Sequence, residues 1–291
     1  MAIWKGIILA GGTGSRLKPL TFAMSKQLMP VYDKPMIYYP LTVLMLAGIR
    51  DLLIITSKEY YRVFENLLGD GRKLGIKITY AIQDNPKGIA DAFLIGEKYI
   101  CRDNVCLILG DNIFHGGSLR SLIKKAKRRE KGATIFSYQV NNPRDYGIIR
   151  FDKNGKPLSL EEKPKSSSNN NAITGLYFFD NSVIEKAKSI KPSKRNELEI
   201  TEVNNLYLED KELHVERLNR GTAWLDTGTF DSLHQAGSYI RTLENRTALK
   251  IGCPEEVAWR MKYITKNQLK SLAKPLLNSG YGEYLIRISN E

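Results

Sequence analysis

The chain has 291 residues with 42% hydrophobic side chains, the composition of an ordinary globular protein with enough residues to bury a large core. No apolar run reaches the roughly 18 residues that span a bilayer, so we expect a cytoplasmic protein with no membrane partner. The net charge of +13 favours anionic ligands, but the densest basic run, 124–129, has no interleaved aromatic residues. We therefore interpret that run as a solvated helix face and expect no nucleic-acid partner.

The first half of the chain alternates strand-like and helix-like segments. Apolar or alternating runs predict strands at 5–10, 51–56, 76–82 and 105–109. Composition and amphipathic spacing predict helices at 40–48, 60–68 and 89–100. Strands that alternate with helices indicate a mostly parallel sheet with helices on both faces.

After residue 131 shorter strands predominate. They are expected at 133–140, 147–152, 158–161, 172–179 and 213–218. An Asn154-Gly155 turn separates the second of these from the third, and the polar run 166–171 predicts a loop. Helices are expected at 199–208, at 231–243 and from 254 to the end. Without a repeat or a long linker, we predict one domain over 1–291, with a catalytic core to about 245 and a helical extension from about 246.

A Gly-rich turn, GGTGSRL, directly follows the first predicted strand at 11–17. Glycines there let backbone N–H groups approach phosphate oxygens without an intervening Cβ, and Arg16 adds a permanent charge. The run has neither the ending of a P-loop nor the spacing of a dinucleotide fingerprint. It predicts a phosphate site, with a tight turn that binds nothing as the alternative. Lys26 is expected to meet the same phosphates, unless it is an ordinary surface lysine.

Two predicted strands, 105–109 and 158–161, are followed by a carboxylate, Asp111 and Glu162 respectively. Asp111 comes after the strand 105–109, at the edge where open α/β sheets bind ligands, and Asp226 is the second candidate. Magnesium prefers one or two carboxylates together with phosphate oxygens, although either aspartate could instead cap a helix or a turn. Glu162 suits sugar hydroxyls and Lys163 suits a phosphate, with an exposed ion pair as the alternative. The three cysteines show no paired spacing, which predicts reduced thiols.

Taken together, these motifs resemble the sugar nucleotidyltransferases, and within them the glucose-1-phosphate thymidylyltransferases. The resemblance extends over essentially the whole chain. It is carried by 25–56 and 272–285 and by the motifs LGDNIF (109–114), LEEKP (160–164), TGLYFFD (174–180), ELEIT (197–201) and AWLDTGT (223–229).

The resemblance implies an α/β fold: a Rossmann-like nucleotidyltransferase core with a mixed, mostly parallel sheet, a smaller sugar-binding β portion and C-terminal helices. It implies that dTTP and glucose 1-phosphate are the substrates and that dTDP-glucose and pyrophosphate are the products. The sugar phosphate would attack the α-phosphorus in line with the help of Mg²⁺, as the first step towards dTDP-deoxysugars such as dTDP-rhamnose. It further implies a homotetramer and a second, regulatory nucleotide site near the C-terminal helices, in the region 253–260.

The resemblance also implies residue roles, position by position. The nucleotide would be bound by Leu9, Gly11, Gly12, Gly14, Ser15, Arg16, Lys26, Gln27, Gln83 and Gly88. The sugar phosphate would be bound by Asn112, Gly147, Glu162, Lys163, Ile173, Tyr177 and Arg195. The metal ligands would be Asp111 and Asp226. The catalytic residues would be Arg16, Lys26, Asp111, Lys163 and Asp226.

The chain departs from the family pattern in the base-binding segment. Lys87 and Asp91 replace the usual Asp and Gln there, and Ile173 replaces a Val near the sugar. Use of UTP, dual specificity or another hexose phosphate therefore stays open, because one methyl group is worth only about 1–3 kcal/mol. A non-catalytic regulatory homologue is the alternative from another class of protein.

Overall fold

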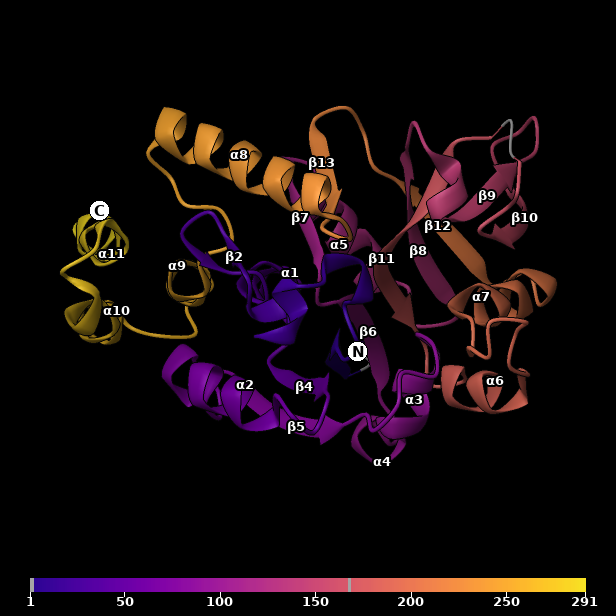
Figure 1. Cartoon of the computed structure of the whole chain (residues 1–291), viewed down its shortest axis with the longest axis horizontal. Helices are drawn as coiled ribbons and strands as arrows, with labels where there is room; N and C mark the ends of the chain where they lie inside the picture. Colours follow the sequence, from indigo (N-terminus) through magenta and orange to yellow (C-terminus); the bar gives the residue numbers. More distant parts are fainter. Residues whose placement is uncertain (1–2, 167–168) are drawn as a thin grey trace.

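A mixed sheet of nine strands forms the centre of the computed structural model, which describes residues 3–166 and 169–291 (Figure 1). Its parallel half has the order β6 (Asn104–Leu109), β1 (Trp4–Ala10), β4 (Asp51–Thr56) and β5 (Lys77–Ile82). The chain fills the β4 side of β1 before it returns to the β6 side. The topological switch point therefore lies between β1 and β6, at the carboxyl ends of both strands.

The second half of the sheet is mainly antiparallel. Strand β11 (Asn171–Phe179) pairs with β6 and with β9 (Gly147–Phe151) along one edge, and with β8 (Ala133–Gln139) along the other. The hairpin partner of β9 is β10 (Pro157–Glu162), and β12 (Leu213–Arg217) pairs with β8. The predicted smaller β portion is thus a continuation of the same sheet. Of the polar run predicted as a loop at 166–171, residues 167 and 168 lie outside the described residues.

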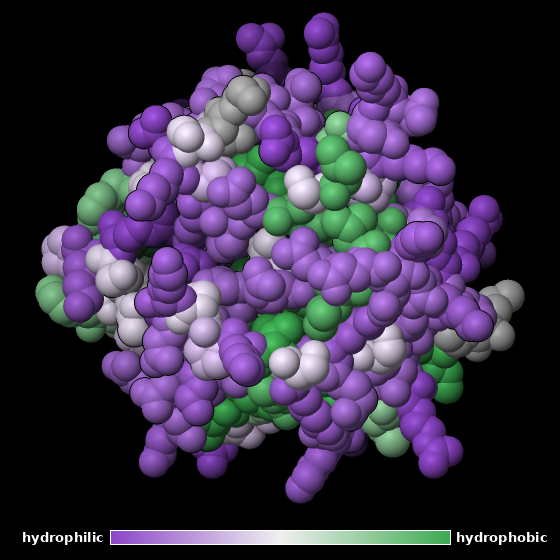
Figure 2. Space-filling view, turned by 90° about the vertical axis from the view of Figure 1, so that its right-hand side faces the viewer, coloured by the Kyte–Doolittle hydropathy of each residue, from purple (hydrophilic) through white to green (hydrophobic). Residues whose placement is uncertain are grey.

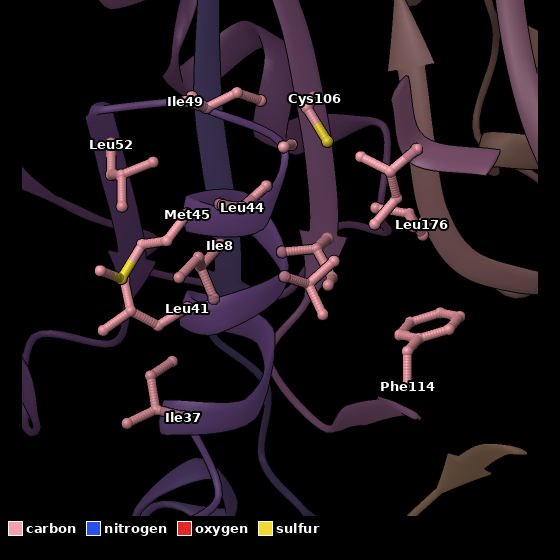
Figure 3. Close-up of a cluster of buried hydrophobic side chains, with 14 of the residues drawn as sticks. Ile8, Ile37, Leu41, Leu44, Met45, Ile49, Leu52, Cys106, Phe114 and Leu176 are labelled. Carbon is pink, nitrogen blue, oxygen red and sulfur yellow. The ribbon is translucent and has the colours of Figure 1, made fainter. Parts of the chain in front are cut away.

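Successive residues of each buried strand point to opposite sides, so both faces of the sheet carry apolar side chains. Helices cover both faces and bury these side chains. In β1, Ile8 packs in a cluster with α1, whereas Ile7 packs in a second cluster with residues of α3. Figure 3 shows side chains of α1 beside those of β1, β4 and β6. The helices of the first half are α1 (Tyr38–Leu46), α2 (Tyr61–Leu68), α3 (Asp91–Ile95), α4 (Glu97–Ile100) and α5 (Leu119–Arg128). The remaining helices are α6 (Val183–Ser189), α7 (Ile200–Glu209), α8 (Phe230–Thr247), α9 (Pro254–Arg260), α10 (Lys266–Ala273) and α11 (Gly280–Ser289).

The single helix predicted at 89–100 is wrong, because the chain is split at Gly96 into α3 and α4. A Cβ at Gly96 would lie 2.9 Å from the Ala92 carbonyl oxygen and 3.0 Å from Ile7 Cδ1. The break therefore sits where the chain packs closely on β1, at a residue that favours helix poorly.

A two-stranded antiparallel ribbon, β7 (Asn112–Gly116) with β13 (Thr222–Asp226), lies outside the main sheet. Neither strand is predicted from the sequence, because five residues give too little periodicity to recognise. A smaller hairpin joins β2 (Pro30–Val31) to β3 (Lys34–Pro35). The ribbon matters for the site, since its register places Asp226 opposite Asn112.

Helices α9, α10 and α11 lie at one end of the molecule, and α6, α7, β9 and β10 lie at the other (Figure 1). The face at the latter end is largely hydrophilic, with smaller hydrophobic areas between the polar side chains (Figure 2). Among the described residues no helix is long and apolar enough to cross a membrane. Cys101, Cys106 and Cys253 are all free, as expected.

Candidate active site

Three segments meet at the carboxyl edge of the parallel strands. Gly11 follows β1, Gln83 follows β5, and Asp111 follows β6 one residue after Gly110. A cavity of about 290 Å³ opens there, beside a second of about 220 Å³ that shares Gly11, Gly12, Arg16 and Asp111 with it. All of the site residues expected from the sequence line one or other of these cavities. Besides these shared residues, the smaller is lined by Gly14, Ser15, Lys26 and Gln27, and the larger by Leu9, Gln83, Gly88, Asn112, Gly147, Glu162, Lys163, Ile173, Tyr177, Arg195 and Asp226.

The Gly-rich turn has a backbone that larger residues rarely adopt. Gly12 and Gly14 have φ values of 107° and 55°, in the region that favours glycine. A Cβ on Gly11 would lie 2.4 Å from Gln83 Oε1, whereas one on Gly12 would meet nothing within 4 Å. The turn therefore leaves open space above Gly12, which suits the close approach of an anion.

Arg16 lies across this turn. It belongs to a short 3₁₀ helix, Ser15–Leu17, and its Nη2 would be 3.0 Å from a Cβ on Gly228. That places the guanidinium beside the segment that follows Asp226. A permanent, planar cation here can face phosphate oxygens over the glycines.

Lys26 and Asp111 form an ion pair between the two cavities. Lys26 Nζ lies 2.6 Å from Asp111 Oδ2, and Lys26 is only 8% exposed. Asp111 Oδ1 accepts a hydrogen bond of 2.8 Å from Asn112 Nδ2. Burial alone would raise the pKa of Asp111, but the Lys26 ammonium holds that pKa below its usual value.

Asp226 is brought to Asp111 by the β7–β13 ribbon. The register pairs Asp226 with Asn112, and Thr227 Oγ1 donates a 2.9 Å hydrogen bond to the Asp111 carbonyl oxygen. Burial, followed by the charge of Asp111, raises the pKa of Asp226 to about 6. Two carboxylates are thus held together at the cost of mutual repulsion.

This pair of carboxylates suits a hard cation that also binds phosphate. The described residues contain no group of three or more His, Cys, Asp or Glu side chains that could hold a metal by themselves. Mg²⁺ needs no such group, because it is commonly bound by one or two carboxylates, water and substrate phosphate oxygens. The repulsion at Asp226 is relieved by any cation placed between the two side chains. The residues present therefore fit Mg²⁺.

The other end of the larger cavity is a network of hydrogen-bonded polar groups. Glu162, the last residue of β10, accepts from Thr201 Oγ1 at 2.5 Å and from Arg195 Nη2 at 3.2 Å. Arg195 also donates to Glu199 Oε2 at 2.7 Å. Lys163 follows with a φ of 42°, a strained conformation for a lysine that its backbone bond to the Tyr146 carbonyl oxygen helps to hold. Three carboxylates, those of Glu162, Glu197 and Glu199, and the two cations of Lys163 and Arg195 thus line one end of this cavity.

Several lining residues were not among the candidates. They are Pro86, Ile89, Leu109, Asp145, Tyr146, Gly175, Glu197, Glu199, Ile200, Thr201 and Trp224. Glu199, Thr201 and Trp224 fall inside motifs that carry the resemblance, so a signal for them was present. Trp224 Nε1 donates to Asn112 Oδ1 at 2.6 Å and so fixes the amide of that candidate. Asp145 and Tyr146 lie outside those motifs, and nothing in their spacing marks them.

Comparison with known proteins gives consistent results. A family model described as nucleotidyl transferase matches residues 5–242. The chain is 54% identical to a glucose-1-phosphate thymidylyltransferase of Neisseria meningitidis, over 98% of this chain and 99% of that protein. It is 56% identical to one of Mycobacterium tuberculosis, over 98% of each chain.

Solved structures agree on the fold. A Bacillus anthracis protein described as a glucose-1-phosphate thymidylyltransferase, crystallised with a sucrose, superposes with a TM-score of 0.76 at 39% identity. That match covers 82% of this chain and 95% of the other. A UDP-glucose pyrophosphorylase complexed with UDP-glucose superposes with a TM-score of 0.72 at 24% identity, over 83% and 99% of the two chains. The expected α/β nucleotidyltransferase fold is confirmed.

Proposed function

The chain belongs to the nucleotidyl transferase family and to its glucose-1-phosphate thymidylyltransferases, and from this premise we propose that it transfers the dTMP moiety of dTTP to glucose 1-phosphate. The products are dTDP-glucose and pyrophosphate. The observation that carries the proposal is that Asp111 and Asp226 line the same cavity as the Gly-rich turn and as Glu162 and Arg195. A reaction between two phosphates in that cavity is served by a cation site that both can reach.

The nucleotide triphosphate lies along the Gly-rich turn in this proposal. The backbone N–H groups of 11–14 face its phosphates, and Arg16 stabilises the charge that develops on the leaving pyrophosphate. Lys26 exchanges its contact with Asp111 for a phosphate oxygen, which frees the carboxylate. Its 2.6 Å ion pair supports this role, because the same ammonium that neutralises Asp111 lies beside the turn.

Glucose 1-phosphate lies at the other end. Glu162 accepts from sugar hydroxyls, and Lys163 with Arg195 holds the phosphate that attacks. Asn112, Gly147, Ile173 and Tyr177 complete the walls around the hexose. A Cβ on Gly147 would lie 3.1 Å from both Glu162 Oε2 and Thr201 Oγ1, so the glycine leaves the carboxylate accessible. Attack in line on the α-phosphorus then requires positioning and charge neutralisation and no covalent intermediate.

Asp111 and Asp226 would hold Mg²⁺ in this scheme. When bound, the cation neutralises phosphate charge and orients the α-phosphoryl group. The side chains themselves fix where that charge is placed, since Asn112 and Thr227 anchor the Asp111 side chain and backbone from two directions. Tetramer formation, feedback control through a second nucleotide site and residence in the cytoplasm stay predictions from the family resemblance.

A pyrophosphate-release assay tests the proposal. Wild-type protein with Mg²⁺ is supplied with dTTP, UTP, CTP, GTP or ATP and with several hexose 1-phosphates, and dTTP with glucose 1-phosphate is expected among the best pairs. Asp111→Asn keeps the side-chain shape and should lower kcat by roughly 10²–10³-fold or more, by analogy with the loss of one transition-state contact. Asp231→Asn, on the exposed start of α8, is the matched control and should leave kcat unchanged. Normal Mg²⁺-dependent turnover in Asp111→Asn would remove the basis of the metal assignment.

A further inference from the structure

The side-chain amide of Gln83 is held at the nucleotide end of the larger cavity. Gln83 is 5% exposed and lines the cavity beside Gly11 and Gly88. Its Nε2 donates a 2.8 Å hydrogen bond to Oδ2 of Asp91, in the first turn of α3. Asp91 is itself 9% exposed, so this bond is shielded from water on both sides.

The chemistry of Asp91 fixes which way this amide faces. An ionised carboxylate only accepts hydrogen bonds, so the NH₂ group of Gln83, and not its carbonyl, must face Asp91. The carbonyl oxygen then points the opposite way, over Gly11, where a Cβ would lie 2.4 Å from it. A glutamine at position 91, the usual residue of the family, could donate or accept, and would leave both orientations of Gln83 available.

The end of the Gln83 amide that does not contact Asp91 is therefore a hydrogen-bond acceptor. None of the described residues donates a hydrogen bond to its Oε1, which leaves that oxygen for a ligand. Thymine and uracil carry an N–H at ring position 3, which can donate to such an oxygen. Cytosine carries a bare ring nitrogen there, and its lone pair would face the lone pairs of the carbonyl. A site with a fixed acceptor rejects a ligand that lacks the donor, because a buried polar group is left unpaired.

We propose that Asp91 is a positioning residue for base selection, which orients Gln83 so that the enzyme accepts imide pyrimidines and rejects cytosine. The inference rests on the proposed function, because it assumes that the base of the nucleotide lies against Gln83. The fixed orientation of Gln83 restricts the nucleotide to one whose base carries an N–H at ring position 3. The carbonyl oxygen reads the N–H that thymine and uracil share and does not touch the 5-methyl group, so uridine nucleotides bind through the same contact.

The test compares dUTP with dCTP, which differ only at the edge of the base that Gln83 would read. Dissociation constants are measured by calorimetry with Mg²⁺ and without sugar phosphate, and kcat/KM is measured by pyrophosphate release. In Asp91→Asn the new amide can accept or donate, so Gln83 is free to turn. The preference for dUTP over dCTP should fall by about tenfold or more in both measurements, mainly because dCTP binds better. Asp84→Asn, an exposed aspartate in the same segment, is the control and should keep the wild-type preference.

The possible outcomes separate this inference from the proposed function. If Asp91 had only a structural role, dUTP and dCTP would lose affinity by the same factor, and the unchanged ratio would overturn the inference. If Asp91→Asn folds poorly, Asp91→Gln restores the residue usual in the family and should relax the preference in the same direction. A wild-type protein that turns over neither dTTP nor dUTP would instead contradict the proposed function. Wild-type turnover with an unchanged ratio in both variants would contradict the role of Asp91 alone.

Discussion

At the scale of single residues, Asp111 and Asp226 are neighbours in opposite electrostatic settings. Lys26 Nζ lies 2.6 Å from Asp111 Oδ2 and lowers the pKa of Asp111. Burial and the charge of Asp111 instead raise the pKa of Asp226. The Lys26 ammonium thus stabilises the charge of Asp111, whereas the charge of Asp226 is unfavourable in the metal-free protein.

This asymmetry predicts how the metal-free protein responds to pH. The pKa of Asp226 in the folded protein, about 6, is above the ordinary value of 3.8, so its contribution to stability is fully present below about pH 4. That contribution is lost as pH rises through about 6, because ionisation is easier in the unfolded chain. Asp226→Asn cannot ionise and should therefore be more stable than the wild type at pH 7.5 by up to about 3 kcal/mol, while losing activity.

Urea denaturation in EDTA at pH 4.5 and pH 7.5 measures this effect. The advantage of the variant should be small at the lower pH and larger at the higher one. Mg²⁺ with dTTP should stabilise the wild type more than the variant, because the variant has lost one carboxylate for the metal. A variant that is less stable than the wild type by the same amount at both pH values would show that ionisation of Asp226 does not destabilise the folded protein.

The sequence predicts which residues line the cavities better than it predicts their contacts. Asp111 could be placed, because it follows an apolar strand at the ligand-binding edge of the sheet. That Asp226 meets it depends on the register of β7 with β13, and neither strand has a recognisable pattern. The sequence does not predict the ion pair of Lys26 with Asp111 either, because it indicates only a phosphate contact for Lys26 and a metal contact for Asp111.

At the scale of elements, a pair of backbone hydrogen bonds joins the segment 83–91 to the segment that holds Arg195. Leu198 N donates to the Lys87 carbonyl oxygen at 2.6 Å, and Ala90 N donates to the Leu198 carbonyl oxygen at 3.1 Å. Gly88 lies between these bonds with a φ of 104°. These two segments are therefore parts of one connected structure.

Gly88→Ala tests that connection. A Cβ there would lie 2.4 Å from the Leu198 carbonyl oxygen and 2.6 Å from its nitrogen, so the two loops must separate. We expect KM to rise by about tenfold for glucose 1-phosphate as well as for dTTP, because a shift of about 1 Å in positioning groups costs up to about 10²-fold in rate. Steady-state kinetics with each substrate varied in turn measures both.

The control for this variant is Gly69→Ala, since Gly69 has a φ of 60° with nothing within 4 Å of its Cβ position. It carries backbone strain without a collision and should lower the free energy of unfolding while leaving both KM values unchanged. A rise confined to dTTP in Gly88→Ala would show that the loops respond independently.

Element boundaries were predictable where apolar runs were continuous. The prediction for β4 at 51–56 agrees with the structure, and those for β1, β5 and β6 differ from it by one residue. The helix predicted at 89–100 failed at Gly96, where packing on β1 outweighs a periodic pattern. Short elements such as α6 and the β7–β13 ribbon depend on tertiary contacts, so local sequence carries little signal for them.

At the scale of the whole molecule, the C-terminal helices are not an appendage. Ala258 of α9 and Leu269 of α10 belong to the same hydrophobic cluster as Ile8 of β1 and Leu41 of α1. The extension predicted from about 246 therefore shares its core with the first strand of the chain. Removing it would expose the apolar face of α1, so we interpret the chain as one cooperative unit.

A buried charge network ties this unit together at the point where α8 ends. Glu244 Oε1 accepts from Lys34 Nζ at 2.8 Å and from the backbone nitrogen of Ile251 at 2.8 Å, while its Oε2 lies 3.1 Å from Lys250 Nζ. Glu244 is 6% exposed and Lys34 is 3% exposed. Asp33 pairs with both lysines and completes the network. The β2–β3 hairpin, α8 and the segment before α9 are thus fixed to one carboxylate.

Glu244→Gln removes one charge from this network and keeps the shape of the side chain. Breaking a buried ion pair by changing one partner costs roughly 3–5 kcal/mol, and because Asp33 still contacts both lysines we expect a loss near the lower end, about 3 kcal/mol. Urea denaturation measures it, against Glu65→Gln as the control. Glu65 pairs with an Arg62 side chain that is 80% exposed, so its loss should be about 1 kcal/mol or less. If the two variants lost the same small amount, the network would not hold the C-terminal helices to the core. A large loss with one unfolding transition by every probe would place these helices inside the cooperative unit, whereas two transitions would separate them from it.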